Sequence, residues 1–430
     1  MADIFTEILN FIIAFFKNPA LLLGIITGVG LWLQKRPWEQ VVTSSIKAAI
    51  GVLLILAGAG MLANAIAPIN TIISILRNTP PVNVTIGTDQ IILQYGTEIG
   101  IAIILGWILN LVLARLLPTK YIMLTGHLIF WDAFWFLVIF RFVGGLTGIS
   151  LIIATALWIG FRWIYQPFYT HFFDEEVNNN EGFVLGHTAS LVVLLTGLIS
   201  KPLGKALKLK KTEEKSIEEL PAILRFFRDP YVFLPIAYML IYLILAIFDW
   251  GLVAQIGGMN PIIYALIQGL SFGAGFAVLM QGVRMLIGEL IPAFQGFAEK
   301  VVPQAKPALD CPLFFPYSPI GMAVGGFVGV VTMVAISLFL TIIGYPYFVY
   351  APTMSVWFHG ATGGVYGDHY AGKTGMILGG IIAGVLMALG SALLIPIIGF
   401  AVGDFLSWAA DTDYVIYGLI LAWLIGLFKS

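Results

Sequence analysis

The sequence predicts an all-α membrane protein, a polytopic bundle of transmembrane helices. Of its 430 residues, 59% are apolar and 10% carry a charge, whereas a soluble domain has about 45–50% apolar and about 25% charged residues. Apolar runs of the ~20 residues that a helix needs to cross a bilayer recur throughout the chain. Backbone amides in lipid must be paired within a helix or a closed barrel, and these runs lack the alternation of barrel strands. The spans are therefore expected to be helices.

Ten or eleven helical spans are expected among the apolar segments, because the short or Gly- and Pro-interrupted segments fit re-entrant or broken helices. The first 18 residues carry Asp3 and Glu7 ahead of any basic residue. A cleaved signal peptide starts with positive charge, so this stretch is expected to be a retained interfacial or membrane helix. The apolar segments run over 19–34, 43–67, 97–117, 121–142, 144–167, 183–200, 232–256, 260–277, 279–296, 320–345, 374–400 and 413–428.

Charge placement divides the chain near its middle. Eight of the 22 Lys and Arg residues lie in the hydrophilic stretch 201–229, which the positive-inside rule places in the cytoplasm. The formal net charge of −1 gives no reason to expect nucleic-acid binding. Cys311 is the single cysteine, which excludes an internal disulfide and a thiolate metal cluster. The whole chain, 1–430, is expected to be one membrane domain.

The two halves of the chain show weak internal similarity. The Gly, Met-Leu and Pro positions of 57–68 coincide without gaps with those of 281–292, and 182–187 (GFVLGH) matches 364–369 (GVYGDH). Together these matches predict two pseudo-symmetric repeats, about 19–200 and 232–428. Interrupted segments at corresponding positions of two such halves indicate a binding site near the bilayer midplane.

Ionisable residues inside apolar runs mark the first candidate site. His127 and Asp132 follow the stretch YIMLTG, and an ionisable group in such a run costs roughly 2.5–3.5 kcal/mol on insertion scales. Such a group is expected to face a cavity or a partner, although a place at an interfacial helix end fits both residues as well.

A histidine flanked by glycines marks the second candidate site. His187 and Thr188 follow GFVLG, where the glycines let backbone amides approach an anionic or hydroxylated ligand. The acidic stretch just before it, 174–181, is expected to be a solvated loop. A ligand-binding role is favoured for His187 and Thr188.

An aspartate among prolines marks the third candidate site. Residues 303–319 read PQAKPALDCPLFFPYSP, and the prolines around Asp310 prevent a regular helix. Unwound backbone at membrane depth is tolerated where it lines a cavity, and Asp310 would there accept hydrogen bonds from sugar hydroxyls. A solvated loop is the alternative, and Cys311 is expected to serve packing.

The glycine-rich stretch 359–370 resembles a phosphate-binding loop only superficially, since it has no GxGxxG order and follows no strand. As a re-entrant tip it would present the backbone of Thr362, Gly364 and Val365 to a ligand. A metal site at His359, Asp368 and His369 would need a further ligand cluster, and no metal or cofactor is expected. An ion pair between helices is expected to explain the charges among Gln281, Arg284 and Glu289. The remaining acidic residues are interpreted as interfacial: Asp249, Asp404, Asp411 and Asp413.

At these positions the sequence resembles enzyme IIC, the membrane component of ascorbate-type phosphotransferase systems (PTS), whose family has a more distant galactitol branch. The resemblance rests on YIMLTGH (121–127), GFVLGH (182–187), MQGVRMLIGELIPAF (280–294), PALDCPLFFPYSP (307–319) and GATGGVYGDHYAG (360–372). It implies a homodimeric, multi-pass permease of the cell membrane, with a scaffold and a mobile core that carries sugar in an elevator-like movement. Separate cytoplasmic EIIA and EIIB proteins would phosphorylate that sugar, since the chain ends at Ser430 without either domain. The basic stretch 201–229 would dock EIIB or face membrane lipid.

The resemblance also implies site residues. His127, His187 and Asp310 match the family's sugar contacts, whereas Trp131 and Thr188 stand where it has glutamines. Thr85 is a weak match to the family's Thr-Tyr pair. Because an amide both donates and accepts hydrogen bonds, its loss leaves the substrate open between ascorbate, another sugar, a pentitol and a hexitol.

Two other function classes compete with a sugar permease. A proton- or ion-coupled carrier would use His127, His187, Asp310 and Glu289 as a relay. An intramembrane enzyme finds no support, because the chain has no HExxH or GxSxG motif, and no catalytic residue is expected.

Overall fold

The computed structural model describes residues 7, 18–76, 82–212 and 230–429. Within them, eight helices are long and apolar enough to cross a membrane. The expectation of an all-α, polytopic bundle is confirmed. The helix expected over the first 18 residues and most of the basic stretch 201–229 lie outside the described residues.

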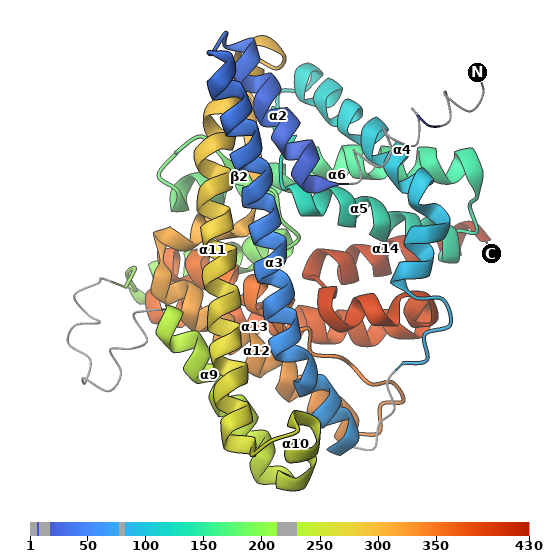
Figure 1. Cartoon of the computed structure of the whole chain (residues 1–430), viewed down its shortest axis with the longest axis vertical. Coiled ribbons are helices and arrows are strands. Elements are labelled where there is room, and N and C mark those ends of the chain that lie inside the picture. The colour runs from blue at the N-terminus through green and yellow to red at the C-terminus, as the bar shows by residue number, and fades with distance from the viewer. Residues whose placement is uncertain (1–6, 8–17, 77–81, 213–229, 430) are drawn as a thin grey trace.

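Two long antiparallel helices run side by side along the molecule (Figure 1). They are α3 (Trp38–Leu76) and α11 (Pro261–Lys300). Glycines allow the close approach: a Cβ on Gly58 would lie 2.4 Å from the backbone nitrogen of Leu279. An ion pair at 3.5 Å joins Lys47 of α3 to Glu289 of α11. The expectation of an interhelical ion pair is thus confirmed for Glu289, with Lys47 as its partner.

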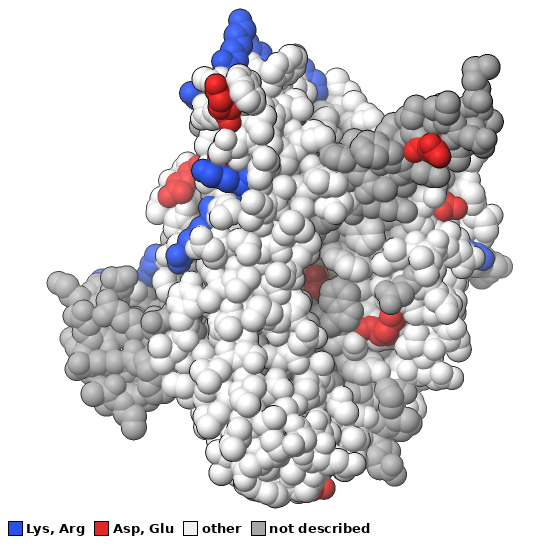
Figure 2. Space-filling view, in the orientation of Figure 1, with Lys and Arg blue, Asp and Glu red and all other residues white. Residues whose placement is uncertain are grey.

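Shorter helices pack beside this pair. They are α2 (Pro19–Leu33), α9 (Pro230–Phe248) and α10 (Trp250–Gly257). Figure 2 shows a broad face without charged side chains over α3 and α11, with Lys and Arg gathered toward its upper end. Large apolar side chains are exposed on these helices, among them Ile46, Leu53 and Leu266. Such a surface is suited to lipid rather than to water.

The remaining elements form the part of the molecule that carries the candidate site residues. The first half of the chain supplies α4 (Thr88–Leu116), α5 (Gly126–Val138), the π-helical turn η1 (Ile139–Val143), α6 (Gly148–Val177) and α7 (Ser190–Leu207). The second half supplies the 3-10 helix η3 (Cys311–Tyr317), α12 (Pro319–Ile342), α13 (Thr353–Ala409) and α14 (Thr412–Lys429).

Helix α13 contains a hairpin rather than one straight rod. Its backbone leaves helical geometry at Ala371 and Gly372, where Gly372 has a φ of 54°. The two arms touch through glycines, since a Cβ on Gly367 would lie 2.0 Å from the carbonyl oxygen of Gly375. Residues 359–370 are therefore helical, which differs from the expected re-entrant tip, because their glycines serve close helix packing.

Three very short parallel strands join the two halves of the chain. The strand β3 (Lys306–Leu309) pairs with β1 (Tyr121–Met123) on one side and with β2 (Val184–Leu185) on the other. No strand is expected from the sequence alone, because segments of two to four residues are too short to show a period. A helix or an irregular segment follows each strand.

Candidate functional site

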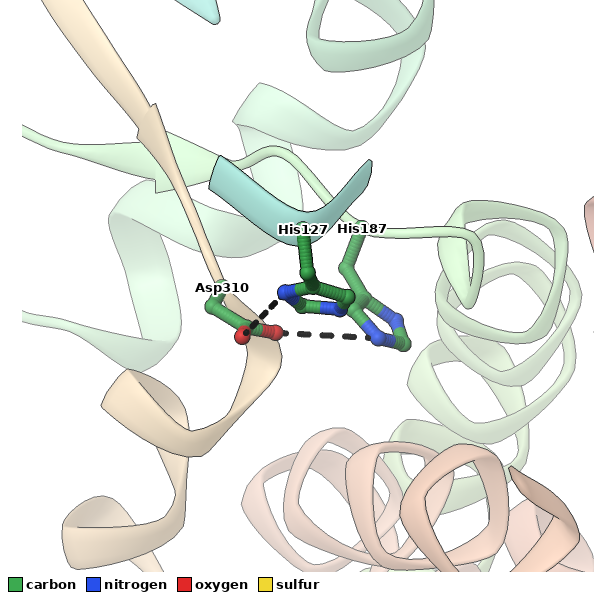
Figure 3. A group of neighbouring side chains, drawn as sticks. All are labelled: His127, His187 and Asp310. Carbon is green, nitrogen blue, oxygen red and sulfur yellow. Dashed lines mark ion pairs between the residues drawn. The ribbon is translucent and has the colours of Figure 1, made fainter. Parts of the chain in front are cut away.

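The parallel sheet brings three distant residues to one edge. His127 follows β1, His187 follows β2 and Asp310 follows β3, and the carboxyl ends of parallel strands meet at the same edge of a sheet. Figure 3 shows the Asp310 carboxylate at one side of the two imidazoles, facing both. Its oxygens lie 3.6 Å from His127 Nδ1 and 3.6 Å from His187 Nε2. The three residues expected to bind a ligand therefore converge.

A cavity of ≈ 270 Å³ opens beside these three side chains. Residues of both halves line it, and most of its wall is apolar or aromatic, as in small-molecule sites that place a few polar groups in an apolar setting. The polar and aromatic lining residues are His127, Trp131, His187, Asp310, Ser355, Phe358, His359, Asp411 and Tyr414.

Local hydrogen bonds fix the orientation of His187. The backbone N–H of Ala189 donates to His187 Nδ1 at 3.1 Å. Burial lowers the pKa of His187 well below its usual value, and His359, His127 and Arg162 lower it further. The neutral ring therefore carries its proton on Nε2, facing Asp310.

That tautomer bears on metal binding. Donor atoms of His127, His187 and Asp310 lie within 4.8 Å of one another, a spacing that a metal ion could bridge. An Nε2 atom that carries a proton cannot ligate a metal, so the group is suited to hydrogen bonding.

Asp310 is held by the start of the helix that follows it. Its Oδ1 accepts a hydrogen bond of 2.7 Å from the backbone N–H of Cys311, the first residue of η3. Burial raises the pKa of Asp310, whereas His127 lowers it. One carboxylate edge thus remains directed at the histidines and the cavity.

A buried polar stripe on α6 positions the segment that carries His187. Arg162, Gln166, Thr170, Asp174 and Asn178 occur at every fourth residue, and all five are fully buried. Residues four apart lie one above the other on a helix, so successive members of the stripe are neighbours.

Three of them hold the backbone that leads to His187. Asn178 donates to the carbonyl of Phe183 at 2.9 Å, Asp174 accepts from the N–H of Leu185 at 2.9 Å, and Gln166 donates to the carbonyl of His187. The expected solvated loop over 174–181 is thus wrong for Asp174, which the fold needs as a buried acceptor. The spacing of four is visible in the sequence but was not used there.

The first residue of the stripe, Arg162, binds two buried carboxylates. It donates to Asp132 at 2.6 Å and to Asp413 at 3.3 Å. Asp132 also accepts from Trp163 at 2.7 Å and from Tyr414 at 3.0 Å. Asp132 therefore belongs to a buried network behind the cavity, and the interfacial interpretation of Asp413 is wrong because that residue is fully buried.

Asp411 lies in the cavity wall rather than at an interface. It accepts hydrogen bonds from the hydroxyls of Thr188 and Ser355, and it is 8% exposed. The Thr188 hydroxyl is thereby turned toward Asp411, while its carbonyl accepts from Thr412 Oγ1 at 2.8 Å. Thr188 thus ties the loop of His187 to the start of α14.

The chain is similar in sequence to known membrane permease components. Residues 14–413 match the family model EIIC-GAT, described as PTS system sugar-specific permease component. The chain belongs to this family. The curated "Ascorbate-specific PTS system EIIC component" of Mycoplasma pneumoniae (strain ATCC 29342 / M129 / Subtype 1) is 28% identical to this chain over an alignment 429 positions long, gaps included, and this alignment covers 86% of the present chain. The chain spans 64% of the length of that relative.

Other expected site residues of this EIIC-GAT chain lie away from the cavity. Thr362 donates to the carbonyl of Phe358 within its own helix, and a Cβ on Gly364 would lie 1.9 Å from the carbonyl oxygen of Gly321. Thr362, Gly364 and Val365 are all buried in α13. In the described part of the chain, none of the three lines the cavity.

Of the residues expected to play a secondary part in the site, one lines the cavity and the others have partners elsewhere. Trp131 lines the cavity, whereas Thr85 donates to the carbonyl of Phe400 at 3.1 Å and Glu289 pairs with Lys47. Asp368 accepts from the hydroxyl of Ser318 at 2.7 Å, and the ring of His369 packs against Tyr370. Sequence reasoning also missed two cavity residues, His359 as a candidate ligand group and Asp411.

Proposed function

We propose that this protein is the membrane permease subunit of a PTS and that it binds ascorbate or a related sugar or polyol in the cavity. Membership of the sugar-specific permease family supports the reaction class, and the name of the Mycoplasma relative supports ascorbate as the first substrate to test. A separate EIIB protein, charged by EIIA, phosphorylates the sugar after its translocation. The permease is a homodimer whose core moves like an elevator.

The convergence of His127, His187 and Asp310 is the observation that carries this proposal. Ionisable side chains are costly in an apolar bundle unless they meet a partner or a ligand. A carboxylate accepts hydrogen bonds from hydroxyl groups, and the His187 N–H donates to a ligand oxygen. Together with the aromatic wall at Trp131, this set is suited to a small, hydroxyl-rich molecule.

A binding experiment on purified protein tests the site. L-ascorbate, xylitol and galactitol are titrated by calorimetry into wild type and Asp310→Asn. We expect the variant to bind the preferred compound at least ~10-fold more weakly, because it loses a charge-assisted hydrogen bond of roughly 1.5–3 kcal/mol.

Asp249→Asn is the matched control. Asp249 begins α10 and accepts from the N–H of Leu252 at 2.9 Å, a capping role that asparagine also fills. It should therefore leave binding unchanged. Equal affinity of wild type and Asp310→Asn would refute the proposed site, and binding of none of the three compounds by wild type would refute a sugar or polyol site.

A further inference from the structure

A third histidine, His359, lines the cavity together with His127 and His187. His359 comes from α13, in the other half of the chain, and its ring centroid lies 5.3 Å from that of His187. It is fully buried and lines the cavity. In the sequence it was considered only as a metal ligand.

Hydrogen bonding fixes which nitrogen of His359 carries the proton. Its Nδ1 lies 2.7 Å from the carbonyl oxygen of Ser355, one helical turn earlier. A carbonyl only accepts hydrogen bonds, so Nδ1 is the donor. In the neutral ring, Nε2 is then a bare acceptor at the far end of the side chain.

This acceptor has no protein partner within the described residues. His359 Nε2 is buried and makes no hydrogen bond there, and His359 takes part in none of the ion pairs found there. A buried polar atom left unpaired costs roughly 1–3 kcal/mol, so an unpaired atom beside a cavity calls for a partner such as a bound water or ligand.

The carboxylate of Asp411, which also lines the cavity, already has a hydrogen-bond donor at each oxygen. Asp411 accepts from Ser355 through one oxygen and from Thr188 through the other. Its position is thereby fixed, and His359 Nε2 remains the acceptor on this wall that no described residue satisfies. His187, with its proton on Nε2, is a donor beside it. The two rings thus offer opposite hydrogen-bonding groups to one ligand.

We infer that His359 is a specificity-determining residue that accepts a hydrogen bond from a substrate hydroxyl next to the oxygen bound by His187. The inference rests on the proposed function and adds the recognition pattern. The favoured substrate class carries a hydrogen-bond-accepting oxygen and a free hydroxyl on neighbouring carbons. Compounds in which that hydroxyl is absent or methylated are rejected.

Two substitutions of His359 distinguish the effect of its hydrogen-bond acceptor from the effect of its size. His359→Gln places an amide oxygen near Nε2 and keeps an acceptor, whereas His359→Leu removes it. In calorimetry with L-ascorbate, xylitol and galactitol, we expect His359→Leu to bind the preferred compound at least ~10-fold more weakly and His359→Gln within about threefold, since a net hydrogen bond is worth roughly 0.5–1.5 kcal/mol and an unpaired partner costs more. His369→Leu, outside the cavity, is the control and should match wild type.

Single-deoxy analogues provide a second test, whose first part uses wild-type protein alone. In wild type, one analogue of the preferred compound, such as 6-deoxy-L-ascorbate for L-ascorbate, should bind at least ~10-fold more weakly. In His359→Leu the same analogue and its parent should bind equally.

The results separate this inference from the proposed function. If Asp310→Asn loses binding while His359→Leu binds like wild type, the role of His359 is refuted and the permease site stands. Full affinity of wild type for every deoxy analogue would also refute it. If wild type binds none of the compounds, both proposals fail together.

Discussion

At the scale of single residues, the site depends on buried charges that are paired with charges of opposite sign. Arg162 lies between Asp132 and Asp413, and all three side chains are fully buried. The sequence identified Asp132 because it interrupts an apolar run. It did not identify Asp413 or Asp411, because both stand between two apolar segments, where an aspartate is usually interfacial. Only the folded structure shows that they are internal, because Asp413 meets Arg162 and Asp411 accepts from Thr188 and Ser355.

Removal of the cation tests this network. Arg162→Met should lower the stability of the detergent-purified protein by about 3–5 kcal/mol, because two carboxylates lose their buried partner. Arg115→Met, at an exposed position, should have little effect on the melting temperature.

A second substitution shows whether charge is the cause. Asp132→Asn in the Arg162→Met background removes one of the unpaired carboxylates and should restore part of the melting temperature. If Arg162→Met melts like wild type, the network does not contribute to stability.

At the scale of elements, glycines serve two structural roles, in a loop and in a close contact between helices. The sequence alone does not distinguish these roles. In 182–187 the glycines flank the strand β2 and the loop that carries His187. In 360–372 they allow the arms of α13 to touch each other and α12. Both stretches are rich in glycine, and the difference lies in what faces each missing side chain, which is a property of the packed helices.

A pair of alanine substitutions tests the packing role. Gly367→Ala should destabilise the protein by about 1–3 kcal/mol, because its Cβ would lie 2.0 Å from the carbonyl oxygen of Gly375 and a packed contact must open. Gly288→Ala is the matched control in α11, where nothing lies within 4 Å of the added Cβ.

Thermal unfolding in detergent is the measurement. Gly288→Ala should be neutral or slightly stabilising, because alanine is the better helix former by about 1 kcal/mol. Equal melting temperatures for the two variants would show that the arms of α13 adjust freely.

At the scale of the whole molecule, the sequence predicted the class of protein. It did not predict how the residues of the site come together. Composition and segment length sufficed to predict a polytopic helical bundle, because the solvent dictates both. The sequence also indicated His127, as an ionisable group in an apolar run, His187, by its flanking glycines, and Asp310, by the prolines around it. Their convergence depends on β3 pairing with strands from the other half, and contacts between segments so distant in sequence leave no local pattern. The internal duplication, the homodimer and the elevator movement stay predictions.

Transport by the intact permease distinguishes the proposed function from an ion-coupled carrier. Proteoliposomes loaded with phosphorylated EIIB should accumulate radiolabelled L-ascorbate, xylitol or galactitol as a phosphate ester, because transfer to the sugar drives the process. Vesicles without phosphorylated EIIB, and vesicles carrying Asp310→Asn, are the controls. Accumulation of unmodified compound in response to a proton gradient alone would identify a secondary transporter instead.

The buried stripe on α6 has one further consequence. Four residues of an α-helix span about 400°, so each step along the stripe turns it by about 40° and its five members wind roughly 160° around the axis. A single line of side chains can therefore contact α5 and α14 at Arg162 and the strand β2 at Asp174. Inserting or deleting one residue between 162 and 178 would rotate one end against the other by ~100°. Natural variation in length is thus expected to avoid this helix.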